Sequence, residues 1–215
     1  MVEIIPAATL ILFRERAGAV PELLITQRAA GMAFAGGALV FPGGRIDPED
    51  HAQAAVHPEF ADAAARIAAL RETAEEVGSD YGLTPADLTP FARWLPKHRQ
   101  ARNFDTLFYL AQAPADARDP VADGGETVRA FWASAADVLA LCDRGEAEVI
   151  FPTRRNLERL AQFGSFAEAV ADAGRHPIVP ITPFHEERED GAWLCIPEGL
   201  GYPVTAERWT SVMRG

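Results

Sequence analysis

Short runs of apolar residues, rich in types that favour β-structure, recur along the chain between polar and Gly- or Pro-containing stretches, and this pattern is typical of β-strands. Two of them, residues 9–14 and 23–28, flank a stretch that contains Gly18 and Pro21, which predicts a β-hairpin. Other strands are expected at residues 38–41, 91–95, 104–110 and 128–133. The intervening residues 31–37, 45–57 and 114–125 are predicted to be loops, and Pro42-Gly43-Gly44 a tight turn.

An alanine-rich segment, residues 58–77, predicts the longest helix of the chain. Its apolar residues Ile67, Leu70, Ala74 and Val77 fall on one side, so this side is expected to face a core. Gly78 follows directly and supplies a C-terminal stop. Shorter helices are expected at residues 134–142, 154–162 and 166–173, the first with Ser134 as its N-cap.

The order of these elements indicates an α+β fold in which a mixed β-sheet is sandwiched between helices. The 215 residues suffice for a single domain with a sizeable core. We expect that core at about residues 5–145, followed by a helical C-terminal extension and tail at about residues 146–215. The tail from residue 176 is rich in Pro and aromatic residues and is expected to wrap over the surface.

Composition and charge narrow the class of protein. Hydrophobic residues make up 48% of the chain and charged residues 24%, as in soluble globular proteins. Residues 7–13 are too few to span a bilayer, and Cys142 and Cys195 are predicted to be reduced thiols, so a cytoplasmic protein that binds no membrane is expected. The net charge of −11 argues against nucleic-acid binding, which needs a basic surface. An anionic substrate therefore needs local cations, from a metal ion or from arginine.

Three carboxylates share one face of the predicted long helix. Glu72, Glu75 and Glu76 lie at positions i, i+3 and i+4, nearly opposite the apolar side. Like charges at this spacing cost roughly 0.2–0.5 kcal/mol per pair, and nothing basic in the same stretch lies among them. A hard divalent cation with oxygen ligands removes this repulsion, so the pattern predicts a metal site.

Residues 71–78, R-E-T-A-E-E-V-G, and the upstream F-P-G-G at residues 41–44 resemble the Nudix box, G-x5-E-x7-R-E-U-x-E-E-x-G-U, where U is a bulky aliphatic residue. The matching residues are Gly44, Arg71, Glu72, Glu75, Glu76 and Gly78. The chain departs from the box at three points. Asp50 replaces the first glutamate, Ser79 replaces the last aliphatic residue, and 20 residues separate Asp50 from Arg71 where the box has seven.

The resemblance implies a Nudix fold and a hydrolase that splits a diphosphate with Mg²⁺ or Mn²⁺. It implies metal binding by Glu72, Glu75 and Glu76, helped by the carbonyl of Gly44, with Glu75 and Glu76 also counted as catalytic. The resemblance implies structural roles for Gly43, Gly78 and Arg71. The partner of Arg71 is expected to be Asp50 or Asp47. Family members often carry a further acid on a distant loop, as metal ligand or general base. Glu126 is placed for that role, or is a solvated loop acid.

A second resemblance concerns the substrate. Residues 24–44 are similar to L-L-T-x-R-S-x3-R-x3-G-x3-F-P-G-G, the signature of Nudix enzymes that hydrolyse coenzyme A. Every spacing holds, but Ala29 and Ala33 stand where the signature has serine and arginine. Residues 103–109, the insertion inside the box and residues 151–154 also resemble the acyl-CoA diphosphatase branch. This likeness implies hydrolysis of coenzyme A or acyl-CoA, with ADP-ribose or NADH as the alternative substrate.

Coenzyme A carries three phosphates, so basic residues near the box are candidate contacts. The expected substrate-binding residues are Arg28, Arg45, Lys97, Arg99 and Arg102. The alternative for residues 97–102 is a solvated hairpin loop. A non-catalytic domain that senses a nucleotide is expected to lack one of the glutamates, whereas all three are present. A homodimer is possible, because Trp193, Tyr202 and Trp209 in the tail suit either an interface or a cover for the core.

Overall fold

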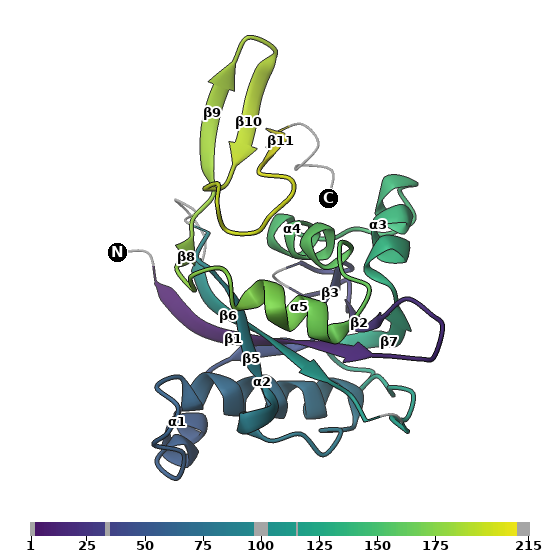
Figure 1. Cartoon of the computed structure of the whole chain (residues 1–215), viewed down its shortest axis with the longest axis vertical. Coiled ribbons are helices and arrows are strands. Elements are labelled where there is room, and N and C mark those ends of the chain that lie inside the picture. Colours follow the sequence, from purple (N-terminus) through teal and green to yellow (C-terminus); the bar gives the residue numbers. More distant parts are fainter. Residues whose placement is uncertain (1–2, 33–34, 97–102, 115, 210–215) are drawn as a thin grey trace.

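The computed structural model describes residues 3–32, 35–96, 103–114 and 116–209. Its centre is a mixed β-sheet in which the strands follow the order β3-β2-β1-β6-β5-β8, with β4 paired to β1 and β7 paired to β2 (Figure 1). The strands of this sheet are β1 (Ile4–Arg14), β2 (Glu22–Arg28), β3 (Leu39–Val40), β4 (Gly43–Arg45), β5 (Thr89–Trp94), β6 (Asn103–Gln112), β7 (Thr127–Ala133) and β8 (Pro180–Ile181).

The central strand β1 lies parallel to β6 and divides the core into two layers. Because successive side chains of a strand point to opposite faces, Ala8, Leu10 and Leu12 pack in one layer while Ile11 and Phe13 pack in the other. All five side chains are buried. The nearly continuous apolar run at residues 7–13 therefore corresponds to burial of the sheet on both faces.

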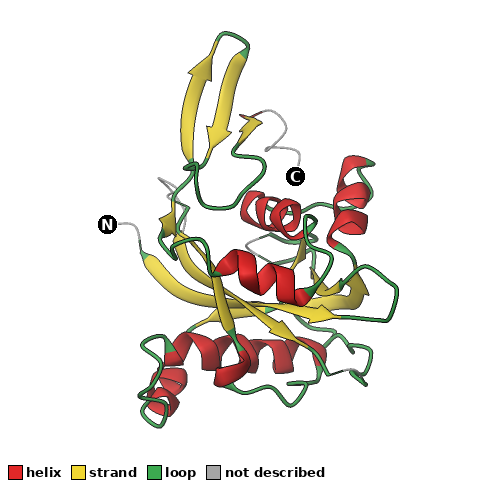
Figure 2. Cartoon of the chain, in the orientation of Figure 1, coloured by secondary structure: helices red, strands yellow, loops and turns green. Residues whose placement is uncertain are grey.

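Helices cover both faces of the sheet, as Figures 1 and 2 show. One face carries α1 (Pro48–Ala54) and α2 (Ala63–Val77), and the other carries α3 (Ala135–Asp143), α4 (Phe151–Leu160) and α5 (Phe166–Ala173). A short 3₁₀ helix, η1 (Pro85–Asp87), precedes β5. This arrangement confirms the predicted α+β fold. In the described part of the chain, every helix is too short or too polar to cross a membrane.

Residues 43–54 are more ordered than the sequence suggested. The predicted tight turn at Gly43 and Gly44 is wrong, because both residues belong to β4 and pair with Thr9 and Ala8 of β1. The predicted loop at residues 45–57 contains the helix α1. Pro48 suits the first turn of this helix, and the Asp50 carboxylate accepts a hydrogen bond from the Asp47 N–H at 2.8 Å.

The helix α2 starts later and packs differently than predicted. It begins at Ala63 rather than at residue 58, and it ends at Gly78, whose φ of 70° gives the left-handed C-cap. Its buried surface is formed mainly by small residues, among them Ala65, Ala68 and Ala69. Ile67, Leu70 and Ala74 remain partly exposed, so the apolar face assigned from the sequence is rotated from the face that meets the sheet.

The C-terminal extension contains the two expected helices, α4 and α5, and the tail covers the body only in part. Ile196 and Tyr202 are buried in the core, where Tyr202 packs against Trp94, as expected for a cover of the core. Other segments of the tail form a separate three-stranded sheet that projects from the body of the molecule (Figure 1). Its strands are β9 (Phe184–Arg188), β10 (Gly191–Cys195) and β11 (Ala206–Arg208). An ion pair of 2.9 Å between Arg155 of α4 and Glu207 of β11 links this sheet to the body.

Candidate active site

The strand β4 lies close to other parts of the protein at two of its glycines. A Cβ atom at Gly44 would overlap the carboxylate of Glu72, and one at Gly43 would overlap the backbone of β1 at Ala8 and Thr9. The two glycines therefore allow a carboxylate of α2 to lie directly against the β4 backbone. The structure thus brings Gly44 and Glu72 together, as the sequence motif predicts.

Arg71 holds α2 to the segment that precedes it. Its Nε and Nη2 donate to the two carboxylate oxygens of Asp50 at 3.0 and 2.9 Å, and Nη2 also donates to the carbonyl of Arg45 at 3.0 Å. Asp50 is fully buried. Burial acts to raise the pKa of Asp50, but the hydrogen bonds from Arg71 and from the Asp47 N–H hold it below its usual value. Asp47, the other candidate partner, lies 3.7 Å from Arg71.

Replacing Asp50 with asparagine is expected to destabilise the fold. The variant keeps the size of the side chain but leaves Arg71 facing an amide, so we expect a loss of roughly 2–3 kcal/mol in the free energy of unfolding. Urea denaturation would measure this loss, with the exposed Asp116→Asn as the matched control. Equal stability of the two variants would show that the pair contributes nothing to folding.

Arg71 also lies among the glutamates, contrary to the expectation that nothing basic does. Its Nη1 donates to Glu72 at 3.0 Å and to Glu75 at 3.2 Å. Both carboxylates therefore converge on one cationic group. The side chain of Glu75 is 61% exposed, so its place in this arrangement is at the solvent side of the site.

Glu76 points the other way, into the protein, and is only 7% exposed. Burial raises its pKa to about 8, and the neighbouring charge of Glu72 acts in the same direction. Arg28, the Gly43 N–H and the Thr26 hydroxyl stabilise the charged form and limit the rise. Burial likewise raises the pKa of Glu72. The three glutamates thus span a range from solvent to core, instead of sharing one exposed face.

Thr26 matches the threonine of the coenzyme A signature, but the sequence predicted no contact between it and the glutamates. It is fully buried, and its Oγ1 lies 3.3 Å from a carboxylate oxygen of Glu76 and 3.4 Å from the carbonyl of Val40. The hydroxyl therefore fixes the orientation of the Glu76 carboxylate through this hydrogen bond.

Removing this hydroxyl is expected to weaken metal binding. Thr26→Val keeps the shape of the side chain but frees the carboxylate of Glu76, so we expect the Kd for Mn²⁺ to rise about 10-fold. Titration of the protein with Mn²⁺, followed by electron paramagnetic resonance, would measure the change. Thr26→Ser keeps the hydroxyl and should bind like the wild type. A Thr26→Val protein with unchanged Kd would show that Glu76 is oriented by other groups.

Glu126 reaches the same region through a loop that is tied to both α2 and β2. The Asp123 N–H donates to the carbonyl of Glu76 at 3.2 Å, and the Ala29 N–H donates to the carbonyl of Glu126 at 2.8 Å. Asp123, which the sequence analysis did not single out, accepts hydrogen bonds from the N–H groups of Gly125, Glu126 and Thr127 and so shapes the loop. The side chain of Glu126 is exposed, and the next residue, Thr127, pairs with Arg28 at the end of β2.

Of the predicted substrate-binding residues, the structure places Arg28 at this site. Its charge acts on Glu76. Arg45 contributes its backbone carbonyl to Arg71, and its own side chain is exposed. Lys97, Arg99 and Arg102 lie outside the described residues.

Comparison with known proteins identifies the class. The model of the NUDIX domain family matches residues 4–153, well over half of the chain. The chain therefore belongs to the Nudix family and is a pyrophosphohydrolase, an enzyme that acts on nucleoside-diphosphate-linked substrates. No curated protein matches the sequence significantly.

Solved structures agree with this assignment. A NUDIX hydrolase from Alicyclobacillus acidocaldarius is 29% identical, with a TM-score of 0.69 over 80% of this chain and 97% of that chain. Two more distant structures show the shared fold alone. One is the NUDIX domain of Shewanella oneidensis NrtR complexed with ADP ribose, which is 18% identical, with a TM-score of 0.52 over 74% of this chain and 86% of that chain. The other is the MutT protein from Methanosarcina mazei Go1, which is 15% identical, with a TM-score of 0.50 over 80% of this chain and 96% of that chain.

Nudix hydrolases generally use divalent cations such as Mg²⁺ or Mn²⁺, and the residues at this site fit such a cation. Carboxylate and carbonyl oxygens are the ligands that hard cations prefer. Glu72 and Glu75 already converge on the guanidinium of Arg71, and Gly44 leaves room for the carboxylate of Glu72. Within the described ranges, however, no three acidic, imidazole or thiol side chains form a ready metal cage.

Proposed function

We propose that this enzyme hydrolyses the diphosphate of coenzyme A or of an acyl-CoA, releasing 3′,5′-ADP and phosphopantetheine or its acyl derivative. The observation that carries the proposal is the position of Arg28. This arginine belongs to the coenzyme A signature at residues 24–44, and its charge acts directly on the buried Glu76. A substrate phosphate beside the glutamates would therefore meet a cation already in place.

Each residue of the site has a distinct role in this proposal. Glu72, Glu75 and Glu76, with the carbonyl of Gly44, would hold Mg²⁺ or Mn²⁺, which neutralises phosphate oxygens and lowers the pKa of a bound water when present. Arg71 and Asp50 fix α2 against β4, so the carboxylates keep their spacing during turnover. Arg28 binds the diphosphate, and Thr26 holds the carboxylate of Glu76.

Glu126 is our proposed general base. Two backbone hydrogen bonds support this role, since they tie the loop to the carbonyl of Glu76 and to the N–H of Ala29 while the side chain of Glu126 stays exposed. A carboxylate in that position takes the proton from the attacking water, provided that it lies within hydrogen-bond reach of that water in the substrate complex.

ADP-ribose is the second candidate substrate. The specific observation in its favour is the presence of Ala29 and Ala33 where the coenzyme A signature has serine and arginine, because this removes one expected phosphate contact. The NUDIX domain of NrtR, which shares the fold, is complexed with ADP ribose in its structure.

A substrate panel separates these candidates. Wild-type enzyme with Mg²⁺ or Mn²⁺ would be given coenzyme A, acyl-CoA, ADP-ribose and NADH, and products would be followed by chromatography. We expect the highest kcat/KM for coenzyme A or acyl-CoA. A strong preference for ADP-ribose would overturn our choice of substrate, and no turnover of any diphosphate would favour a nucleotide-sensing domain.

A further inference from the structure

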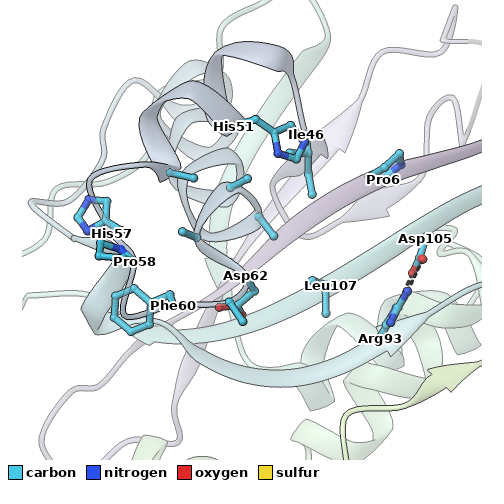
Figure 3. Close-up of a pocket in the computed structure, with 15 residues that line it drawn as sticks. Pro6, Ile46, His51, His57, Pro58, Phe60, Asp62, Arg93, Asp105 and Leu107 are labelled. Carbon is cyan, nitrogen blue, oxygen red and sulfur yellow. Dashed lines mark hydrogen bonds and ion pairs between the residues drawn. The ribbon is translucent and has the colours of Figure 1, made fainter.

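A pocket of about 510 Å³ lies beside the N-terminal end of α2, outside the glutamate site (Figure 3). Its size falls within the range of small-molecule binding sites. Apolar side chains form much of its wall, including Pro6 of β1, Leu107 of β6, Ile46 after β4 and Phe60 before α2. Figure 3 shows these side chains around the same open space.

The pocket is built mainly by the segment that is longer here than in the Nudix box. His51 and Ala54 of α1, Phe60 in the following loop and the first residues of α2 all lie between Asp50 and Arg71. The additional residues therefore do more than connect two elements, because they fold into one wall of a cavity against β1, β5 and β6.

The charged side chains that line the pocket are paired within the protein. Arg93 donates two hydrogen bonds to Asp105, at 2.8 and 2.6 Å, as the dashed lines in Figure 3 show. Asp62 accepts hydrogen bonds from Arg66 at 2.7 Å and from Tyr109 at 2.8 Å. Since these charges already satisfy one another, the pocket suits an uncharged group rather than a phosphate, and the apolar side chains beside them and beside His51 and His57 suit its hydrocarbon part.

Three elements carry residues of both the pocket and the glutamate site. Ile46 lies two residues after Gly44, roughly 7 Å along an extended chain. Ala65 lies two turns before Glu72, on the same side of α2 and roughly 10 Å away along its axis. In α1, Asp50 binds Arg71 while the next residue, His51, lines the pocket. A flexible arm as long as about four extended residues spans roughly 13 Å and bridges this separation.

We propose that the pocket receives the acyl end of an acyl-CoA whose diphosphate lies at the glutamates. This inference rests on the function proposed above and deepens it, because it makes acylated coenzyme A a better substrate than the free thiol. The phosphopantetheine arm connects the two sites, and the apolar wall at Ile46, Phe60 and Leu107 contacts the acyl chain.

Filling the pocket tests the assignment. Ala54→Phe places a ring in the pocket, while Ala52→Phe adds the same ring at an exposed position of the same helix, outside the lining. We expect Ala54→Phe to raise the KM for octanoyl-CoA about 10-fold, equivalent to losing roughly two buried methylenes, and to leave the KM for coenzyme A unchanged. Ala52→Phe should resemble the wild type with both substrates. Ala61→Phe, which enters the pocket from the loop before α2, is a second filling variant in case Ala54→Phe fails to fold.

The outcomes separate the two proposals. A wild-type enzyme that hydrolyses neither coenzyme A nor octanoyl-CoA, but does hydrolyse another diphosphate, would overturn the proposed function and the acyl assignment with it. Hydrolysis of both, with folded filling variants that change both KM values equally or neither, would overturn the acyl assignment alone.

Discussion

Replacing Glu75 with glutamine is expected to lower kcat by roughly 10²–10³-fold while leaving the fold intact. The amide cannot serve as an anionic metal ligand, and loss of the metal's charge stabilisation costs several kcal/mol in the transition state. Stability should hardly change, because the side chain of Glu75 is 61% exposed and its only described ion pair is the one with Arg71. Exposed pairs of this kind contribute about 0–1 kcal/mol, so we expect the Tm to move by no more than about 4 °C.

The measurement needs three readouts on the same preparations. Steady-state kinetics with the best substrate of the panel gives kcat, Mn²⁺ titration gives the Kd of the metal, and thermal melting gives the Tm. Glu49→Gln is the matched control, since Glu49 is an exposed glutamate in α1. A Glu75→Gln enzyme with the kcat and Mn²⁺ affinity of the wild type would remove Glu75 from the metal site.

The parts of the fold that could be predicted are those in which burial or capping leaves a signal in the sequence. Consecutive apolar residues in β1 and β2 mark a sheet covered on both faces, and Ser134 and Ser165 cap the helices that follow them. The helix α1 was missed because it has only seven residues, too few for a helical period to show. The strand β9 was missed because all five of its residues are exposed, so burial imposes no alternation on its sequence.

The sequence predicted which residues form the candidate site, but not how deeply each glutamate is buried. Helical spacing places Glu75 and Glu76 on either side of Glu72, about 60° and 40° away around α2. The sequence cannot show which of the two turns toward the sheet, because that depends on how far α2 is rotated. The small side chains of Ala65, Ala68 and Ala69 let α2 approach the sheet closely, and this rotation carries Glu76 to Thr26. The same rotation leaves Ile67 and Leu70 partly exposed.

Burial of Glu76 has a consequence for stability. In the absence of divalent metal, the free energy of unfolding is expected to fall as pH rises from about 5 to about 8.5. The pKa of Glu76 is about 8 in the folded protein, against an ordinary value of 4.5 in the unfolded chain. Between these values the folded protein binds a proton that the unfolded chain has lost, so raising the pH favours unfolding. At about 1.4 kcal/mol per pKa unit, the decline is on the order of 3–5 kcal/mol, and Glu72 acts in the same direction.

Urea denaturation at several pH values, with a chelator present, would measure this decline in the wild type and in Glu76→Gln. The glutamine variant has no titrating group at this position, so its stability should vary much less over the same range. The pKa values of Asp50 and Asp172 are lowered, so these groups change the stability only below about pH 4, outside the range of pH 5 to 8.5. Saturating Mg²⁺ should abolish the decline in the wild type, because a cation that binds the ionised carboxylates stabilises the folded protein increasingly as the proton is lost. Equal pH dependence in the two proteins would show that Glu76 is not the buried titrating group, whereas a decline that persists with saturating Mg²⁺ would separate Glu76 from the metal.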